Sequence, residues 1–322
     1  AQEASKDGQV QRYQMEQQLK ELAQPSEPAF ERESAGKLMR SVARRAWRRL
    51  PAEQEIQGLL KLYDEDRAAG LSFDFAVKTS LKAILVSPDF LYRFQTSRGS
   101  TDPYLINDRE LAERLAFFIW ASLPDDELLQ AAAQGKLSDP LVVKQQAARM
   151  LNDPRAEALA TEFAGYWLHF SGFNSFSGPD AEKYPEFTNS LREAMYDESR
   201  LFMMDLIRNN RPINNLIEAD YTFANEELAK FYGLKDVPKG PEMQRVSTEG
   251  TVRGGVLTMG SLLTKHSAPL RTSPVKRGVW VYEQILGIKL PPPPPVPLLS
   301  DDETNEDGMT IAQQLEKHRA DP

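Results

Sequence analysis

The sequence predicts an all-α protein of two to three packed helical modules, with a polyproline arm and an acidic tail. Apolar residues recur at intervals of three and four along most of the 322 residues, as they do on one face of a helix. Alternation of apolar and polar residues is scarce, and only residues 244–251 suggest a short β-hairpin. Hydrophobic residues make up 41% of the chain, enough for each module to bury a core.

Proline, glycine and serine divide this helical pattern into five segments. Residues 99–102 form the clearest linker, and the five prolines at 291–295 favour a polyproline II helix, which is extended and lacks internal hydrogen bonds. We expect an N-terminal helix and linker at 1–30, a first helical module at 31–98, a central helical module at 99–240, a basic helical module at 241–290, and the arm and tail at 291–322.

Capping signals mark the first expected helices. Residues 8–23 form a weak amphipathic helix, and residues 31–50 place arginines opposite an apolar face. Pro51 is tolerated in the first turn of the next helix. Ser72 can accept a hydrogen bond from a free amide at the start of a helix that ends near residue 86, and Ser87 with Pro88 begins another.

The central and basic modules continue the series of helices. Asn107 and Glu110 are spaced as in a capping box, in which side chains bond to the free amides of the first turn. Further helices are expected at 125–134, 138–151, 153–170, 186–208, 225–231, 256–263 and 273–287. One shared core is expected to contain Leu115, Phe118, Ile119, Trp167, Phe202 and Leu206.

Composition argues against several classes of function. The net charge of −8 does not suit a nucleic-acid-binding protein, which needs a basic surface. No apolar run approaches the roughly 20 residues of a membrane-spanning helix, so no such segment is expected. Without cysteine there is no disulfide and no thiolate zinc site. Three histidines are too few for a His-rich metal cluster, so we expect no metal and no cofactor within this chain.

Residues 265–278 are the richest candidate site. Ser273 precedes a proline where a helix should begin, so the free amides and the positive end of that helix lie beside it. Arg271, Lys276 and Arg277, with His266 nearby, would gather there around an anion such as a sulfate, a carboxylate or a haem propionate. Alternatively, Ser273 is only a helix cap and the cations pair with the acidic tail, because residues 239–289 carry a net charge of +5 and residues 300–322 one of −5.

For three other groups we favour a structural role over a functional one. An arginine-rich helix face suggests either an anion patch or, as we favour, a solvated face paired with glutamates; it comprises Arg40, Arg44, Arg45, Arg48 and Arg49. Carboxylates at helical spacing suggest either a metal site or, as we favour, a polar outer face; they are Glu193, Asp197, Glu198 and Asp205. His169 is expected to be packed or to cap a helix end.

Several strings of residues are similar to one known family. Residues 44–50 and 83–93 look like its first module, and residues 115–124 (Leu-Ala-Phe-Phe-Ile-Trp-Ala-Ser-Leu-Pro) and 220–225 like its central module. Residues 253–255, 271–278 and the proline run resemble its next module. The chain thus resembles a planctomycete-type, cytochrome-c-associated multidomain family of unknown function.

The resemblance implies a setting for the chain. In this family, a stretch like His318 to Pro322 is followed by a Cys-x-x-Cys-His segment, which attaches c-type haem. The implied function is a helical scaffold in an exported, periplasmic or extracellular protein that supports electron transfer by a haem segment beyond residue 322, with a cytochrome c domain or a redox partner protein as its partner. The alternatives are an extracellular enzyme that acts on polymers, by oxidation or otherwise, and a purely structural interaction protein.

Overall fold

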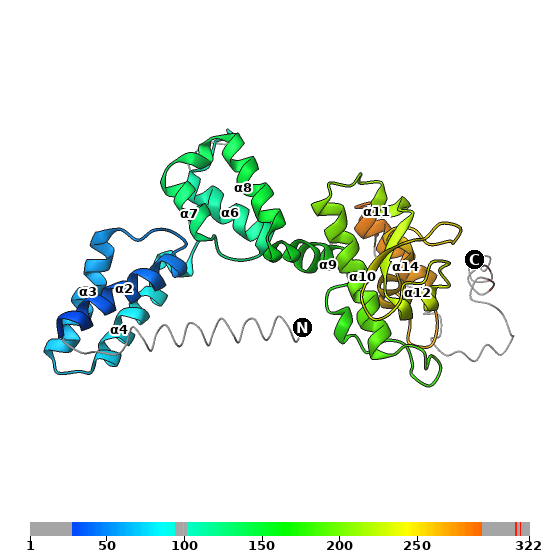
Figure 1. Ribbon diagram of the computed structural model, residues 1–322, viewed down its shortest axis with the longest axis horizontal. Coiled ribbons are helices and arrows are strands. Elements are labelled where there is room, and N and C mark those ends of the chain that lie inside the picture. The colour runs from blue at the N-terminus through cyan, green and yellow to red at the C-terminus, as the bar shows by residue number, and fades with distance from the viewer. Residues whose placement is uncertain (1–27, 94–98, 100–101, 292–312, 314–315, 317–322) are drawn as a thin grey trace. The chain divides into compact units, whose positions relative to one another are not determined.

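The computed structural model describes residues 28–93, 99, 102–291, 313 and 316 (Figure 1). This part of the chain is mostly helical, with one two-stranded sheet, so the expected all-α class is confirmed. The chain divides into two compact units, unit 1 (Ala1–Arg155) and unit 2 (Ala156–Pro322). The helix expected at 8–23, the acidic tail except Gln313 and Glu316, and the proline run except Pro291 lie outside the described residues. The division into five segments stays a prediction.

The first helices of unit 1 pack around one apolar core. They are α2 (Pro28–Ala46), α3 (Glu53–Ala68) and α4 (Phe73–Val86), followed by the short α5 (Pro88–Leu91). Met39, Ile56 and Ile84, one from each long helix, are fully buried in this core. The Ser72 hydroxyl accepts a hydrogen bond from the Phe75 amide, which confirms the expected cap at the start of α4.

The second part of unit 1 contains α6 (Asp108–Trp120), α7 (Asp126–Ala133), the 3₁₀ turn η1 (Lys136–Ser138) and α8 (Pro140–Asn152). The 3₁₀ turn η2 (Pro154–Glu157) spans the division between the units. The Asn107 side chain accepts a hydrogen bond from the Glu110 amide, as expected from the capping signal. The Trp120 indole donates to the Met150 carbonyl at 2.9 Å, and this buried bond fixes α6 against α8.

The expectation of one shared core is wrong. Phe118 is 72% exposed, whereas its neighbour Ile119 is only 4% exposed. The buried face of α6 includes Ala112, Ala116 and Trp120, and Phe118 lies off this face. The six residues are also divided between the units: Leu115, Phe118 and Ile119 in unit 1, and Trp167, Phe202 and Leu206 in unit 2.

Unit 2 is arranged around the long helix α10 (Asn189–Arg208). Met195 of α10 shares a core with Phe173, Leu228 and Tyr232. The elements before α10 are the π-helix η3 (Leu159–Ala164), α9 (Gly165–Trp167) and η4 (Phe173–Ser175). Those after it are α11 (Asn215–Glu218), β1 (Tyr221–Ala224), α12 (Glu226–Tyr232), β2 (Gln244–Ser247), η5 (Val256–Thr258), α13 (Gly260–Lys265), α14 (Pro274–Trp280) and the π-helix η6 (Val281–Ile285).

The sheet corrects the expected hairpin at 244–251. A strand does form there, but its antiparallel partner is β1, with Tyr221 opposite Ser247. The two strands are not adjacent in sequence, since α12 lies between them. Local alternation at 244–251 therefore identified a strand, but the strand pairs with residues that lie 20 to 26 positions earlier.

Candidate functional site

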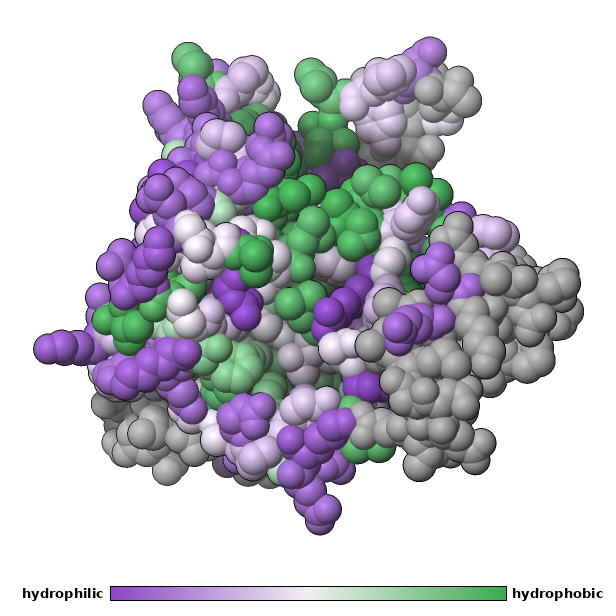
Figure 2. All heavy atoms as spheres, turned by 90° about the vertical axis from the view of Figure 1, so that its right-hand side faces the viewer, coloured by the Kyte–Doolittle hydropathy of each residue, from purple (hydrophilic) through white to green (hydrophobic). Residues whose placement is uncertain are grey.

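Unit 2 contains a pocket of about 220 Å³ beside α10, α12, α13 and the segment that leads into α14. Its apolar lining includes Phe187, Met195, Phe231 and Leu263. Its charged lining, among the residues that the structure describes, consists of Arg253, Arg271, Arg277 and Glu186. Figure 2 looks onto unit 2 and shows hydrophobic residues gathered between hydrophilic ones. An excess of cations over carboxylates in a pocket lining favours an anionic ligand.

Arg253 is held against the wall of this pocket. Its guanidinium carbon lies 3.4 Å from the centroid of the Tyr232 ring, and its Nη1 donates to the Thr258 carbonyl at 2.7 Å. Gly254 allows the chain to pass close to a neighbouring segment, because a Cβ at this position would lie 2.8 Å from the Ala219 carbonyl oxygen. The glycine and the two contacts together fix where the Arg253 charge lies.

Arg277 links α14 to α13. Its Nη2 donates to the Leu263 carbonyl at 3.2 Å and to the Ser267 hydroxyl at 3.0 Å. Its Nε is buried and has no hydrogen-bond partner among the described residues. Burial lowers the pKa of Arg277, because removal from water disfavours the charged guanidinium. An anion that accepts from this side chain would compensate for the lost hydration.

The Tyr232 hydroxyl connects the pocket lining to a buried carboxyl group. It donates to Glu198 Oε2 at 2.6 Å and accepts from the Gly260 amide at 2.7 Å, while the Thr222 hydroxyl donates to Glu198 Oε1 at 2.6 Å. Glu198 is 1% exposed, and burial raises its pKa to about 7, although both hydrogen bonds and the charge of Arg253 act in the opposite direction. A carboxyl that titrates near neutral pH therefore lies one hydrogen bond from a lining residue.

Tyr232 keeps its proton in this arrangement. Burial raises the pKa of Tyr232 well above its ordinary value, and the neighbouring Glu198 carboxylate raises it further. Gly260 is required here, because a Cβ at this position would lie 2.6 Å from the Tyr232 hydroxyl oxygen. The contact between the amide and the hydroxyl thus depends on the absence of a side chain.

Of the candidate residues at 265–278, some line the pocket and others do not. Arg271 and Arg277 both line the pocket, together with Arg253. Ser273 is 8% exposed, and its hydroxyl caps α14 by accepting from the Lys276 amide at 3.3 Å. The Lys276 side chain is exposed and lies outside the lining. Capping by Ser273 therefore coexists with an arginine-lined pocket; anion binding by these residues stays a prediction.

His266 lies outside the lining and pairs with His169. The Nδ1 of His266 is 2.8 Å from the Leu262 carbonyl oxygen, and its Nε2 is 3.3 Å from His169 Nδ1. Burial lowers the pKa of His266, and the charges of His169 and Lys265 act in the same direction. His169 follows α9 with a φ of +68°, the left-handed conformation that often ends a helix, and its side chain is exposed. His169 thus lies at the expected helix end, where its exposed ring stacks on that of His266 with 5.5 Å between the ring centroids.

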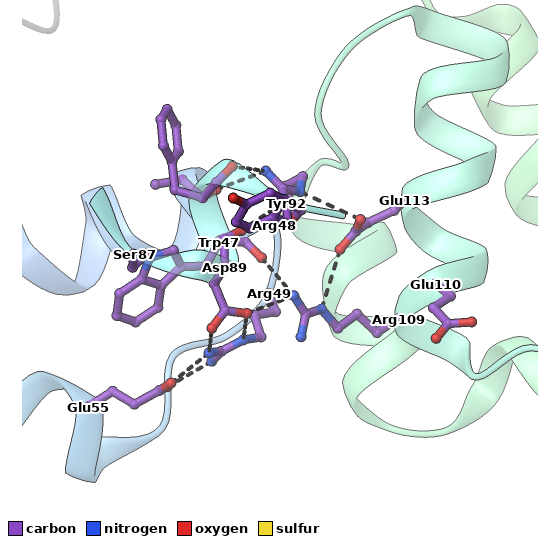
Figure 3. A network of polar contacts seen from close by, with 12 residues as sticks. Trp47, Arg48, Arg49, Glu55, Ser87, Asp89, Tyr92, Arg109, Glu110 and Glu113 are labelled. Carbon is purple, nitrogen blue, oxygen red and sulfur yellow. Dashed lines mark hydrogen bonds and ion pairs between the residues drawn. The ribbon is translucent and has the colours of Figure 1, made fainter. Parts of the chain in front are cut away.

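The favoured interpretation of the arginine-rich face, a solvated surface, is wrong for Arg48 (Figure 3). Arg48 is 7% exposed and donates to the carbonyls of Asp89 and Tyr92 at 2.7 and 2.9 Å. Its Nε lies 3.5 Å from a carboxylate oxygen of Glu113 on α6. The physical reason is that α2 ends at Ala46, so Arg48, with a φ of +55°, lies in the turn after the helix and not on its face.

Arg49 extends the same network within unit 1. It forms ion pairs with Glu55 at 2.6 Å and with Asp89 at 3.0 Å, and Arg109 of α6 pairs with Asp89 at 3.0 Å. The hydrogen bonds from Arg49, and then that from Arg109, lower the pKa of Asp89, although burial acts in the opposite direction. The network therefore holds α3, α5 and α6 together. Arg40 does match the expectation, since its pair with Glu53 is exposed.

The carboxylates of α10 also need a correction. Glu193 is exposed as expected, but Glu198 is buried. Asp205 accepts from the Tyr221 hydroxyl at 2.7 Å, and its side chain is only 9% exposed. The signal for Glu198 was present in the sequence, because this residue falls on the stripe formed by Leu191, Met195 and Phe202. Among the described residues, no group of histidine and carboxylate side chains could hold a metal ion.

Covalent attachment of c-type haem does not fit these residues. Such a haem is bound through two cysteine thiols, and the 322 residues contain no cysteine. The three arginines of the pocket suit an anionic group and provide no axial ligand. Within the part of the chain that the structure describes, no helix has the length and apolar character needed to cross a membrane.

The described residues form two mostly helical units, and unit 2 has a pocket lined by three arginines. Three family models match the chain in order. Each is described as a protein of unknown function: DUF1595 (PSD5) matches residues 34–95, DUF1592 (PSD4) residues 106–234, and DUF1588 (PSCyt3) residues 253–322. The chain is thus similar to these three families over most of its length, and the link of these families to cytochrome-c-associated proteins rests on their names alone. Searches of curated proteins and of solved structures found no match.

Proposed function

We propose that the chain is the helical scaffold of an exported, cytochrome-c-associated protein, and that unit 2 of this scaffold binds an anionic group in the arginine-lined pocket. The observation that supports binding is the lining itself, which among the described residues contains three arginines, Arg253, Arg271 and Arg277, and one carboxylate, Glu186. Guanidinium groups bind carboxylates and phosphates through two parallel hydrogen bonds, and they keep their charge when partly buried.

The link to a cytochrome rests on the family names and on the resemblance of the sequence. The proposed partner is a cytochrome c domain or a redox partner protein, and the haem belongs to that partner or to a segment outside these 322 residues. A periplasmic or extracellular location is part of the same proposal. The role of the described helices is to position the partner and to bind the anion.

Thermal unfolding of the full chain tests the anion site. At constant ionic strength, replacing chloride by acetate or phosphate should raise the Tm of the wild type, since a ligand that binds only the folded state stabilises it. Arg271→Ala should abolish this rise. Lys276→Ala is the matched control, because Lys276 is a neighbouring cation outside the lining, and it should keep the rise. No rise in the wild type, or equal loss in both variants, contradicts the site.

The acidic tail is the alternative anion for the arginines. Its removal distinguishes binding of the tail from binding of an external anion. Deletion of residues 300–322 should change neither the Tm measured without ligand nor the rise in Tm that acetate causes. If the deletion lowers the Tm and Arg271→Ala adds nothing further, the tail is the partner of the arginines.

The link to a cytochrome needs a separate experiment. Haem staining and intact mass of the natural protein should reveal haem on the chain or on a stable partner. A natural protein that has neither haem nor a haem-bearing partner contradicts the link.

A further inference from the structure

We infer that the occupant of the pocket is a carboxylate carried by a single apolar ring, of which benzoate is the simplest example. This inference rests on the anion site proposed above and names the chemistry of its ligand. Three features of the lining support it: the volume of the pocket, its apolar walls, and the position of the arginines.

The volume of the pocket is sufficient for one ring. The pocket holds about 220 Å³. An apolar cavity of roughly 150 Å³ in another protein accommodates benzene. The pocket therefore has room for a six-membered ring and a carboxylate.

The walls favour an apolar ring over a sugar. Phe187, Phe231 and Leu263 line the pocket, and Phe231 is 46% exposed, so a ring that packs on it removes apolar surface from water. Two of the hydroxyl groups in the lining already donate within the protein: Tyr184 to the Leu270 carbonyl at 3.0 Å and Ser267 to the Leu263 carbonyl at 2.8 Å. These two hydroxyls therefore have no free proton for the hydroxyls of a sugar acid, whereas the phenylalanines provide an apolar surface for a ring.

The arginines favour a carboxylate over an uncharged ring. Arg277 has a buried Nε without a partner among the described residues, while its Nη2 is held by Leu263 and Ser267. The charges of Arg271 and Arg277, which line the same pocket, attract a carboxylate, and an uncharged ring gains nothing from them. Inorganic phosphate meets the same cations, but it has no apolar part to pack on Phe187 and Phe231, so it gains less from this pocket.

Calorimetric titration of the full chain tests the inference at pH 7 and constant ionic strength. The probes are benzoate, acetate, phosphate, glucuronate and benzyl alcohol. We expect benzoate to bind at least about tenfold more tightly than each of the others, as the burial of a ring implies. Phe231→Ala should weaken benzoate about tenfold and leave acetate unchanged. Phe75→Ala, at a similarly exposed phenylalanine of unit 1, is the matched control and should change neither.

The outcomes separate this inference from the proposed function. If acetate, phosphate or glucuronate binds as tightly as benzoate, the ring is not recognised, and the inference fails while the anion site stands. If benzyl alcohol equals benzoate, the site is apolar and both fail. If none of the anions binds to wild type, both also fail. Loss of benzoate binding in Arg271→Ala with retained binding in Lys276→Ala supports both.

Discussion

Arg253 lies over the ring of Tyr232, with its guanidinium carbon 3.4 Å from the ring centroid, and the hydroxyl of the same tyrosine donates to Glu198 at 2.6 Å. Tyr232 thus contacts Arg253 through the face of its ring and Glu198 through its hydroxyl group. The charge of Arg253 also lowers the pKa of Glu198, against the larger effect of burial. The charge of Arg253 and the protonation of Glu198 therefore influence each other.

Glu198 should make the stability of the protein depend on pH. Its pKa is about 7 in the folded protein against an ordinary value of 4.5, so the folded state holds a proton that the unfolded chain has released between these values. The stabilisation is fully present below pH 4.5 and is lost as the pH rises through 7, by on the order of 3 kcal/mol. Urea unfolding at pH 5 and pH 8 measures the difference between wild type and Glu198→Gln.

The unfolding free energy of the wild type should fall between pH 5 and pH 8. In Glu198→Gln, whose amide stays neutral, this fall should be much smaller. Glu193→Gln is the control, since Glu193 is exposed on the same helix, and it should follow the wild type. A Glu198→Gln profile identical to that of the wild type would show that Glu198 does not titrate in this range.

Phe118 and Ile119 should respond in opposite ways to truncation. Phe118 is 72% exposed and Ile119 is 4% exposed, although they are adjacent on α6. Ile119→Ala should cost about 2–5 kcal/mol because it leaves a cavity. Phe118→Ala should change the unfolding free energy by less than about 0.5 kcal/mol, as is usual at an exposed site. A larger loss of unfolding free energy in Phe118→Ala would show that Phe118 belongs to the core.

Arg48 should be far more sensitive to substitution than Arg40. Arg48→Ala removes the donor to the carbonyls of Asp89 and Tyr92 and leaves Glu113 with one ion-pair partner fewer in a buried site, so we expect a loss of about 3–5 kcal/mol. Arg40→Ala breaks only an exposed pair with Glu53 and should cost less than about 1 kcal/mol. Equal Tm values for the two variants would be inconsistent with a buried network at the end of α2.

Two glycines provide a test of the close approach at Tyr232. Gly260→Ala places a Cβ about 2.6 Å from the Tyr232 hydroxyl, so it should lower the Tm and weaken binding in the pocket that both residues line. Gly278→Ala in α14 meets no atom within 4 Å and should be neutral or stabilise by about 0.4–1 kcal/mol. Thermal unfolding checks both, and an unchanged Gly260→Ala variant would argue against the tight contact.

The sequence predicted what depends on local signals. Ser72, Asn107 and Ser273 each cap a helix in the structure, because capping needs only one polar side chain and the amides two or three residues later. It also pointed to Arg271 and Arg277, which line the pocket.

Features that depend on contacts distant in sequence were not predictable in this way. The partner of β2 lies beyond α12, and Arg253 reaches the pocket through contacts with Tyr232 and Thr258. Arg48 was misassigned because the end of α2, only two residues earlier, moves it off the helix face. Glu198 is the exception, since its position on the apolar stripe of α10 was visible in the sequence.

The most direct test of the central claim is a crystal structure of the full chain with 4-bromobenzoate. The bromine gives an anomalous signal that locates the ring without reference to the protein. The account predicts one strong bromine peak against Phe187 and Phe231, with the carboxylate within hydrogen-bond distance of Arg271 or Arg277. A bromine peak elsewhere with this pocket empty, or a ring whose carboxylate points away from the arginines, would contradict it.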